Sequence, residues 1–482
     1  MLIAAVGVYL AVTIGIGLWA ARRVHNARDF LIAGRSLPLY INTATVFATW
    51  FGAETVLSVS ATFAKDGLGG VVADPFGSTF CLVFLALFFA RPFYRMDLLT
   101  IGDFYRKRYN KPVEVITSLA ITASYLGWAS AQLTALGLAF SAISGGWLSL
   151  DQGIVLGTLF VLGYTIWGGM WSVAFTDLFQ SVVIIVGLAL IAWLLGRQAG
   201  GAGHVVMSAA AAGKFNFWPA GGLAQWLAFF AAWLTLAVGA IPQQDIFQRV
   251  TAAKDEDTAV RASLLGGACY FAFAFVPMFI VYAALVSEPS LAAVLSSDDS
   301  REVQRLLPDL ILDKTPLWAQ VVFFGALLSA ILSTASGALL APTGLFTENV
   351  LKPFQGRMGD SRFLFVLRVV LVAFTLCALL FALASRSTLY EMVQDAYKVT
   401  LVGAFVPLSA GIYWKRANTA GAVLSIVLGA GSWGVMELWG SGSIWPAQLV
   451  GLAFAVVGMV IGTLVTPAPA HSQTAFYPQR PC

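Results

Sequence analysis

Charged residues are scarce in this chain. Only 11% of its 482 residues are Asp, Glu, Lys or Arg, and 59% are hydrophobic. A soluble protein carries about 25% charged residues. The hydrophobic excess recurs from Met1 to about Thr466, whereas a single soluble core stops growing near about 250–300 residues. The composition therefore excludes a soluble protein with one anchor and indicates an all-α polytopic membrane protein.

Cysteine and histidine are also rare. The four cysteines and three histidines show no spacing typical of a disulfide framework or a metal site. His25, His204 and His471 all fall in predicted loops or in the C-terminal tail, so we do not expect an enzyme. The net charge of +4 is small and gives no reason to expect a nucleic-acid partner. We expect the partners to be the lipid bilayer and a small-molecule solute, with the chain a monomer or a loose homo-oligomer.

Thirteen hydrophobic segments are candidate membrane spans. They cover residues 2–20, 38–64, 74–94, 113–143, 152–169, 173–196, 222–244, 261–287, 315–348, 363–385, 393–414, 418–438 and 443–465. The first has no basic region before it and no clear cleavage site, so it is predicted to be a span and not a signal peptide. With the N-terminus outside, 20 of the 28 Lys and Arg residues fall on the cytoplasmic side. The pattern predicts a multi-pass protein of the cell inner (plasma) membrane with a cytoplasmic C-terminus.

Two of these segments are interrupted near their middles. The second contains Gly52 and Glu54, and the seventh, "LTLAVGAIPQQDIFQRV", contains Pro242 followed by two glutamines. Proline removes a helix hydrogen bond, and backbone groups freed in this way must find partners inside the protein or line a cavity. Paired interruptions at corresponding positions are typical of the binding site of a secondary transporter. Two isolated kinks are the alternative interpretation.

Several longer motifs resemble one known family. "GYTIWGGMWSVAFTDLFQ" (Gly163–Gln180), "ARDFLIAGRSLP", "LLSAILSTASGALL" and "GIYWKRANTAGA" resemble stretches of the sodium:solute symporter family, in order and over nearly the whole chain. "FATWFGAE" and "GAIPQQDIFQRV" look closest to its high-affinity choline transporter branch. The resemblance implies the leucine-transporter fold with 13 transmembrane helices, two inverted five-helix repeats, unwound helices 2 and 7, and sodium as the coupling ion.

The resemblance and the spans together predict a division of the chain. Residues 1–37 form the first span and a cytoplasmic loop, 38–196 the first repeat, and 197–221 an external loop. Residues 222–414 form the second repeat, 415–466 hold the last two spans, and 467–482 are a polar, proline-rich tail expected to be disordered.

A group of hydroxyl side chains in the ninth span suggests a sodium site. Sodium is a hard cation that prefers oxygen ligands. The resemblance implies that backbone oxygens of Ala48, Phe51 and Ala330 bind it together with the hydroxyls of Ser333 and Thr334. It also implies a second site in some family members, here formed by Asp177, Ser333 and Ser336. Position 337, which would supply one more hydroxyl, is glycine, so the question whether a second sodium ion binds stays open.

The candidate substrate residues combine rings, acids and amides. Trp50 and Trp128 match positions where the choline branch holds a quaternary ammonium, and Gln243 and Ser78 stand where that branch has a tryptophan and a tyrosine. Glu54 matches a glutamate that sugar-transporting members use on their substrate. Gln244 can donate and accept hydrogen bonds. A final candidate, Asp74, has a capping role at the start of the third span as its alternative.

We therefore expect a sodium-coupled symporter that imports a cationic or zwitterionic nitrogen compound such as choline, betaine or an amino acid. A sodium-coupled sugar or polyol symporter is the alternative substrate class. A membrane sensor or channel-like protein is the alternative from another class, although the few residues after Thr466 do not suggest a signalling domain.

Overall fold

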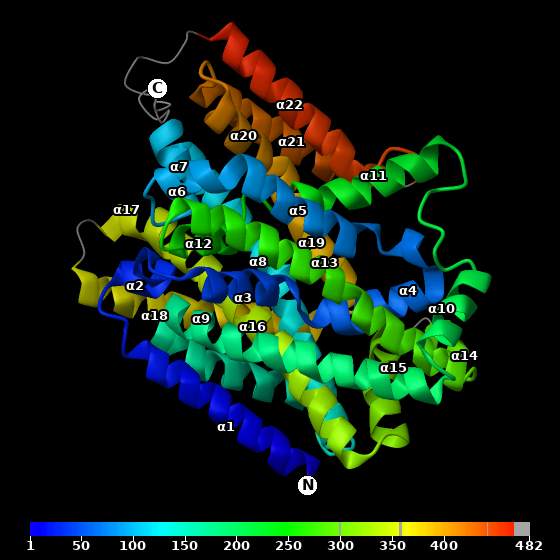
Figure 1. Cartoon of the computed structure of the whole chain (residues 1–482). Helices are drawn as coiled ribbons and strands as arrows, with labels where there is room; N and C mark the ends of the chain where they lie inside the picture. The colour runs from blue at the N-terminus through cyan, green and yellow to red at the C-terminus, as the bar shows by residue number, and fades with distance from the viewer. Residues whose placement is uncertain (298–299, 356–358, 441, 467–482) are drawn as a thin grey trace.

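The computed structural model describes residues 1–297, 300–355, 359–440 and 442–466, and within these ranges the chain is helical with no named strand (Figure 1). The α-helices are α1 (Leu2–Ala21), α2 (Ala27–Ile32), α3 (Leu39–Trp50), α4 (Ser60–Asp66), α5 (Ser78–Phe84), α6 (Ala90–Arg95), α7 (Ile101–Arg108), α8 (Lys111–Ile143), α9 (Leu150–Gln198), α10 (Ala202–Ala211), α11 (Leu223–Ala237), α12 (Gln244–Ala252), α13 (Glu256–Ser287), α14 (Leu291–Leu295), α15 (Ser300–Lys314), α16 (Leu317–Leu345), α17 (Lys352–Gln355), α18 (Asp360–Ala384), α19 (Leu389–Thr400), α20 (Val406–Tyr413), α21 (Thr419–Trp439) and α22 (Ala447–Val465). Short π-helical segments join several of them into longer rods.

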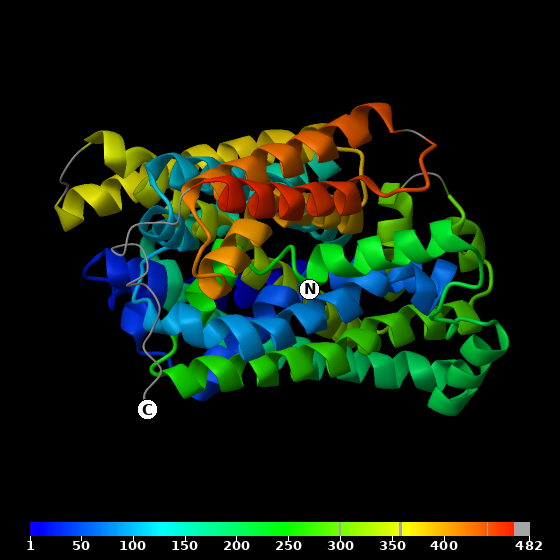
Figure 2. The ribbon, with the colours of Figure 1, turned by 90° about the horizontal axis from the view of Figure 1, so that it is seen from above.

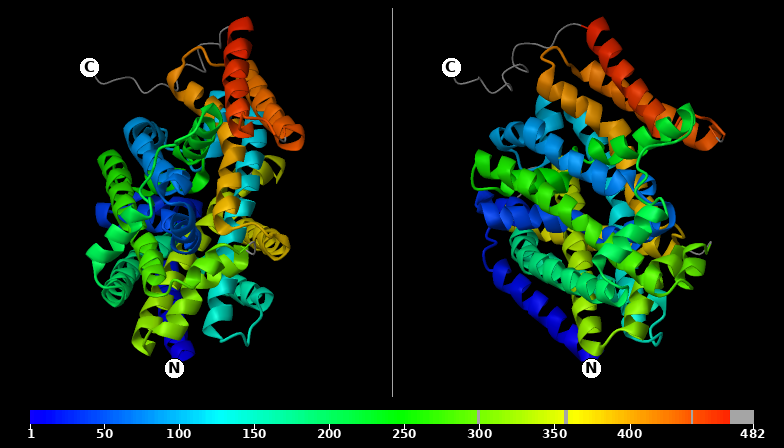
Figure 3. Two further views of the ribbon diagram at one scale, coloured as in Figure 1. Left: turned by 90° about the vertical axis from the view of Figure 1, so that its right-hand side faces the viewer. Right: turned by 45° about the vertical axis from the view of Figure 1, so that its right-hand side comes forward.

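Ten helices in the described ranges are long and apolar enough to cross a membrane. An eleventh results if α3 and the segment Glu54–Asp66, which meet at an angle of 54°, are counted as one bent span. The long helices lie side by side in a single bundle (Figure 2). Figures 1 and 3 show α1 at one end of this bundle and the paired helices α21 and α22 at the other. Many large apolar side chains on outer helices, such as Leu380, Val427 and Leu464, are exposed, as expected of a lipid-facing surface.

Two predicted spans, 152–169 and 173–196, are joined in the structure. They form α9, whose helical conformation is interrupted at Gly169 (φ 49°, ψ −145°). A β-carbon on Gly169 would lie 2.4 Å from the carbonyl oxygen of Phe30 in α2, so this turn requires glycine both for its positive φ and for the close approach. The predicted external loop at 197–221 contains a helix, α10, that the sequence did not predict. The predicted tail at 467–482 lies outside the described residues.

The two interrupted segments are tied together at one end. The second predicted span, 38–64, consists of α3 and, after residues 51–53, the segment Glu54–Asp66. The seventh, 222–244, consists of α11, after which the chain leaves the helical path before α12. The Leu37 N–H donates to the Ala252 carbonyl (2.9 Å), and the Lys254 N–H donates to the Leu37 carbonyl (3.0 Å). The start of α3 and the end of α12 are therefore joined through the main chain.

Candidate functional site

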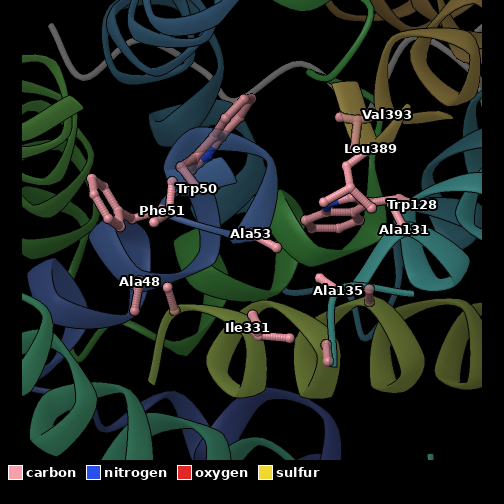
Figure 4. Packing of buried hydrophobic residues seen from close by; sticks show 14 of the residues in the cluster. Ala48, Trp50, Phe51, Ala53, Trp128, Ala131, Ala135, Ile331, Leu389 and Val393 are labelled. Atoms are coloured by element: carbon pink, nitrogen blue, oxygen red, sulfur yellow. The ribbon is translucent and has the colours of Figure 1, made fainter. Parts of the chain in front are cut away.

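The break after α3 is stabilised inside the protein. The Phe51 N–H still bonds to Phe47 (3.0 Å), but Phe51 has non-helical angles (φ −89°, ψ 75°). The backbone N–H of Ala53, freed by the break, donates to the Gln132 side chain at 3.3 Å. A β-carbon on Gly52 would lie 2.4 Å from Glu54 Oε2, so a side chain here would displace the Glu54 carboxylate, which folds back against the break. Figure 4 shows Trp50, Phe51 and Ala53 at this break. Gln132 thus bonds both to the backbone freed by the break and to the Glu54 carboxylate.

The predicted sodium ligands come from α3 and α16, which lie side by side. Ser333 Oγ donates to the carbonyl oxygens of Ala48 (3.0 Å) and Ala330 (3.1 Å). Thr334 Oγ1 donates to the same Ala48 oxygen at 3.2 Å. All four residues are fully buried, and Phe51 stands at the break itself, three positions after Ala48. The structure therefore brings four of the five predicted residues into direct contact through oxygen atoms, which are the atoms that a hard cation uses.

The residues predicted for a second sodium lie deeper in the bundle. Ser336 donates to the Ser333 carbonyl at 2.9 Å. Asp177, from the second half of α9, is fully buried, and neither of its carboxylate oxygens has a hydrogen-bond partner in the described part of the chain. Elsewhere in the described ranges, no group of three His, Cys, Asp or Glu side chains is placed to hold a metal ion.

A small enclosed cavity lies beside the break. Its volume of about 10 Å³ leaves room for about one water molecule. Five of the seven predicted substrate residues line this cavity: Trp50, Glu54, Asp74, Ser78 and Trp128. The other lining residues are Thr49, Leu236, Tyr390, Val393, Gln394 and Tyr397. The lining contains two acids and four aromatic rings but no Lys, Arg or His.

Both acids in the cavity are bonded to neutral donors. Glu54 Oε2 accepts a hydrogen bond from Gln132 Nε2 at 2.7 Å. Asp74 accepts from Ser78 Oγ (2.8 Å) and from the Tyr270 hydroxyl, with Thr55 Oγ1 at 3.4 Å. Among the described residues, neither carboxylate has an ion pair with a basic side chain, and both are about 95% buried. The cavity is therefore lined by two carboxyl groups that have no cationic partner among the described residues.

The aromatic rings of the cavity form a connected set. The rings of Trp50 and Tyr397 stack with centroids 6.3 Å apart and an interplanar angle of 16°. Trp128 lies at the same centroid distance from Tyr397, at 47°. In Figure 4, Trp128 of α8 lies near Val393 of α19, and both residues line the cavity. Three rings from α3, α8 and α19 thus surround the space next to Glu54, as a cation-binding aromatic site requires.

Sequence reasoning missed the contribution of α19. Tyr390 and Tyr397 stand seven positions apart in "LYEMVQDAYKVT", so they share one helix face. The predicted span 393–414 began too late to include Tyr390. The spacing of the two tyrosines was the available signal, but nothing local indicated that this face points toward the break.

The two glutamines after the second break do not line the cavity. Gln243 Nε2 donates to Ser124 Oγ of α8 (3.0 Å) and Thr400 Oγ1 of α19 (3.3 Å). Gln244 Oε1 accepts from the Ile101 N–H at the start of α7 (2.8 Å). The glutamines therefore connect α12 to neighbouring helices. Gln243 Oε1 and Gln244 Nε2 have no hydrogen-bond partner among the described residues, and contact of these glutamines with the solute stays a prediction.

A bundle of apolar helices with a broken helix, clustered buried hydroxyl and carbonyl oxygens, and a cavity lined by acids and aromatic rings is typical of a multi-pass membrane transporter. Residues 30–429 match the model of the sodium:solute symporter family, and the chain belongs to this family. The family resemblance noted from the motifs is thereby confirmed. Membership makes this chain a transporter and not an enzyme, and it indicates sodium as the coupling ion.

Named relatives cover most of this chain. It is 27% identical over 448 residues to the high-affinity choline transporter 1 of Drosophila melanogaster, covering 87% of this chain and 68% of that protein. It is 26% identical over 463 residues to a sodium/glucose cotransporter of Vibrio parahaemolyticus, covering 87% and 82% respectively.

Solved structures show the same fold. A Na+-coupled sialic acid symporter in a substrate-bound, outward-open state superimposes with a TM-score of 0.82 at 18% identity, over 97% of this chain and 98% of that one. The nucleobase-cation-symport-1 family transporter MHP1 in a closed conformation gives 0.61 at 14% identity, over 93% and 97%. These similarities show that the chain shares the leucine-transporter fold of these proteins.

Proposed function

We propose that this protein is a sodium-coupled secondary active symporter that imports a small organic solute carrying a positively charged nitrogen, by alternating access. The observation that carries the proposal is the cavity beside the α3 break, where Glu54 and Asp74 have only neutral hydrogen-bond donors. A buried carboxylate in a membrane protein is costly without a counter-charge, and an ammonium group in the cavity would supply it. Trp50, Trp128 and Tyr397 add cation–π attraction of roughly 2 kcal/mol for each desolvated contact.

The proposed sodium site consists of Ala48, Phe51, Ala330, Ser333 and Thr334. The hydroxyls of Ser333 and Thr334 already meet the Ala48 carbonyl, and rotation of these hydroxyls would turn their lone pairs to an ion. Trp50 lies two residues after Ala48, so sodium and solute act on the same short segment. Sodium binding would fix the break in the form that presents Trp50 and Glu54 to the solute. Because such coupling is reciprocal, the solute would also tighten sodium binding.

We also propose the finer architecture predicted from the sequence. Division of α9 at Gly169, and treatment of α11 with α12 as one broken span, gives thirteen transmembrane helices with breaks in the second and seventh. Residues 38–196 and 222–414 would then be the two inverted repeats, with 197–221 outside and 415–466 as two further helices. The distribution of Lys and Arg supports an outer N-terminus, a cytoplasmic C-terminus and the plasma membrane as the location.

A sugar or polyol is the second candidate solute. Its support is the similarity to a protein named sodium/glucose cotransporter together with Glu54 and Gln394 in the cavity lining, since carboxylate and amide oxygens accept hydrogen bonds from hydroxyl groups. Two acids in one cavity exceed what a neutral solute needs, so the cationic solute is the stronger proposal.

Uptake into proteoliposomes tests the proposal. The purified protein is reconstituted, and uptake of labelled choline, betaine, amino acids, polyamines and glucose is measured under an inward sodium gradient and an equal potassium gradient. We expect sodium-driven uptake of at least one nitrogen cation or zwitterion, with competition by other quaternary ammonium compounds. Sodium-driven uptake of glucose alone, insensitive to such cations, would contradict the proposed solute class.

A further inference from the structure

A buried acid lies apart from the solute cavity, on α9, which packs against α16. Asp177 is fully buried, and both of its carboxylate oxygens are without hydrogen-bond partners among the described residues. An acid in this position requires a cation nearby if it is to remain ionised in the membrane.

Arg249 of α12 supplies a positive charge to this region. Its guanidinium is 2% exposed and lies within electrostatic range of Asp177. Nε donates to Thr49 Oγ1 (2.9 Å), and Nη1 donates to the Asp245 carbonyl (3.3 Å). Nη2 has no hydrogen-bond partner in the part of the chain that the structure describes. Within the described ranges, one arm of the guanidinium therefore has no partner, and neither do the two Asp177 oxygens, although the two side chains do not form a direct ion pair.

Asp245 is the other acid within electrostatic range of Arg249. Its carboxylate accepts a hydrogen bond from the Tyr125 hydroxyl, and its N–H donates to the same hydroxyl at 2.8 Å. Asp177 has no comparable donor, so it depends on Arg249 more than Asp245 does.

Gly337 of α16 makes room for the guanidinium. A β-carbon on Gly337 would lie 2.7 Å from Arg249 Nη2, closer than a carbon and a nitrogen can pack. A side chain at position 337 and Arg249 in its observed place therefore exclude each other. Position 337 is also where one more hydroxyl would complete a sodium site with Asp177, Ser333 and Ser336, and this space holds the guanidinium instead.

We propose that the Arg249 guanidinium is a tethered cation that takes the place of a second sodium ion at Asp177, so that each transport cycle couples to one sodium ion. A mobile sodium ion beside the fixed guanidinium would be repelled by it in this buried region. Through Thr49, Arg249 also joins the Asp177 region to the end of α3, a link that a second ion would otherwise make. The inference rests on the proposed sodium site at Ser333 and Thr334.

Counting sodium ions on the purified protein tests the inference without knowledge of the solute. Equilibrium binding of ²²Na⁺ is measured in detergent at constant ionic strength. We expect one saturable sodium per wild-type protein with a Hill coefficient near 1. The double variant Arg249→Gln/Gly337→Ser, which exchanges the guanidinium for a hydroxyl, should bind a second sodium that Asp177→Asn removes again. Arg249→Lys, which keeps the charge, serves as the matched control and should retain a single ion.

The outcomes separate this inference from the proposed function. Two ions on the wild-type protein would overturn the inference, as would a single ion on a monodisperse Arg249→Gln/Gly337→Ser protein. If that variant does not purify as a monodisperse species, the number of sodium ions bound to the wild-type protein still tests the inference. No saturable sodium binding on the wild type, or a count left at one by Ser333→Ala/Thr334→Val, would instead overturn the proposed sodium site.

Discussion

Replacement of Glu54 by glutamine removes a charge from the cavity with little change of shape. The glutamine oxygen can still accept the hydrogen bond from Gln132 Nε2 that Glu54 now receives at 2.7 Å. An ammonium group about 4 Å from the carboxylate gains about 4 kcal/mol at an effective dielectric constant of about 20. The amide dipole and the remaining charge of Asp74 recover part of this energy. We therefore expect Glu54→Gln to lose about 2 kcal/mol, or about 30-fold in affinity for a cationic solute.

The assay is solute binding to purified protein at saturating sodium, supported by uptake into proteoliposomes. Asp151→Asn, at the exposed N-terminal end of α9, removes an acid far from the cavity and serves as the control. Sodium binding should be unchanged in both variants when solute is absent. Unchanged affinity of Glu54→Gln for the cation would refute the assignment of Glu54 as its counter-ion, and an equal loss for cations and sugars would favour a hydrogen-bonding role.

Three further predictions concern the same region. Ser333→Ala/Thr334→Val should abolish sodium-driven uptake in a protein that remains folded, because both hydroxyls at the Ala48 carbonyl are lost; normal sodium dependence of uptake would contradict the site. Tyr397→Phe should keep affinity for the cation within about threefold, whereas Tyr397→Ala should lose about 2 kcal/mol with the ring, as measured by competition binding. Gly52→Ala should impair solute binding through its clash with the Glu54 carboxylate but have little effect in a Glu54→Ala background, which a double-mutant cycle measures.

The sequence predicted the features that depend on local composition. Apolar runs predicted the helices, since a spanning segment must satisfy its own backbone hydrogen bonds. Gly52 marked the break after α3 because it lies in the middle of such a run, and the Ser333–Thr334 pair stood out as hydroxyls in an apolar helix. The boundary predicted between residues 169 and 173 matches the kink at Gly169, whereas α19 begins at Leu389 and not at the predicted residue 393.

The features that sequence reasoning missed depend on contacts between distant segments. Tyr397 reaches Trp50 across about 350 positions of sequence, and no local pattern states which helix α19 faces. Gln243 stands where the choline branch has a tryptophan. Its Nε2 bonds to α8 and α19, which no local pattern indicated, and its contact with the solute stays a prediction. The sequence shows that a residue is polar, whereas the packing of the bundle decides which way its side chain points.

The two main-chain hydrogen bonds at Leu37 have a mechanical consequence. They join the segment before α3 to the end of α12, and the bonded groups belong to the backbone, so no side-chain rearrangement can release them. We therefore expect these two ends to stay together if α3 and α12 move relative to the rest of the bundle. An opening of the cavity would then be widest at the ends of these helices that lie farthest from Leu37.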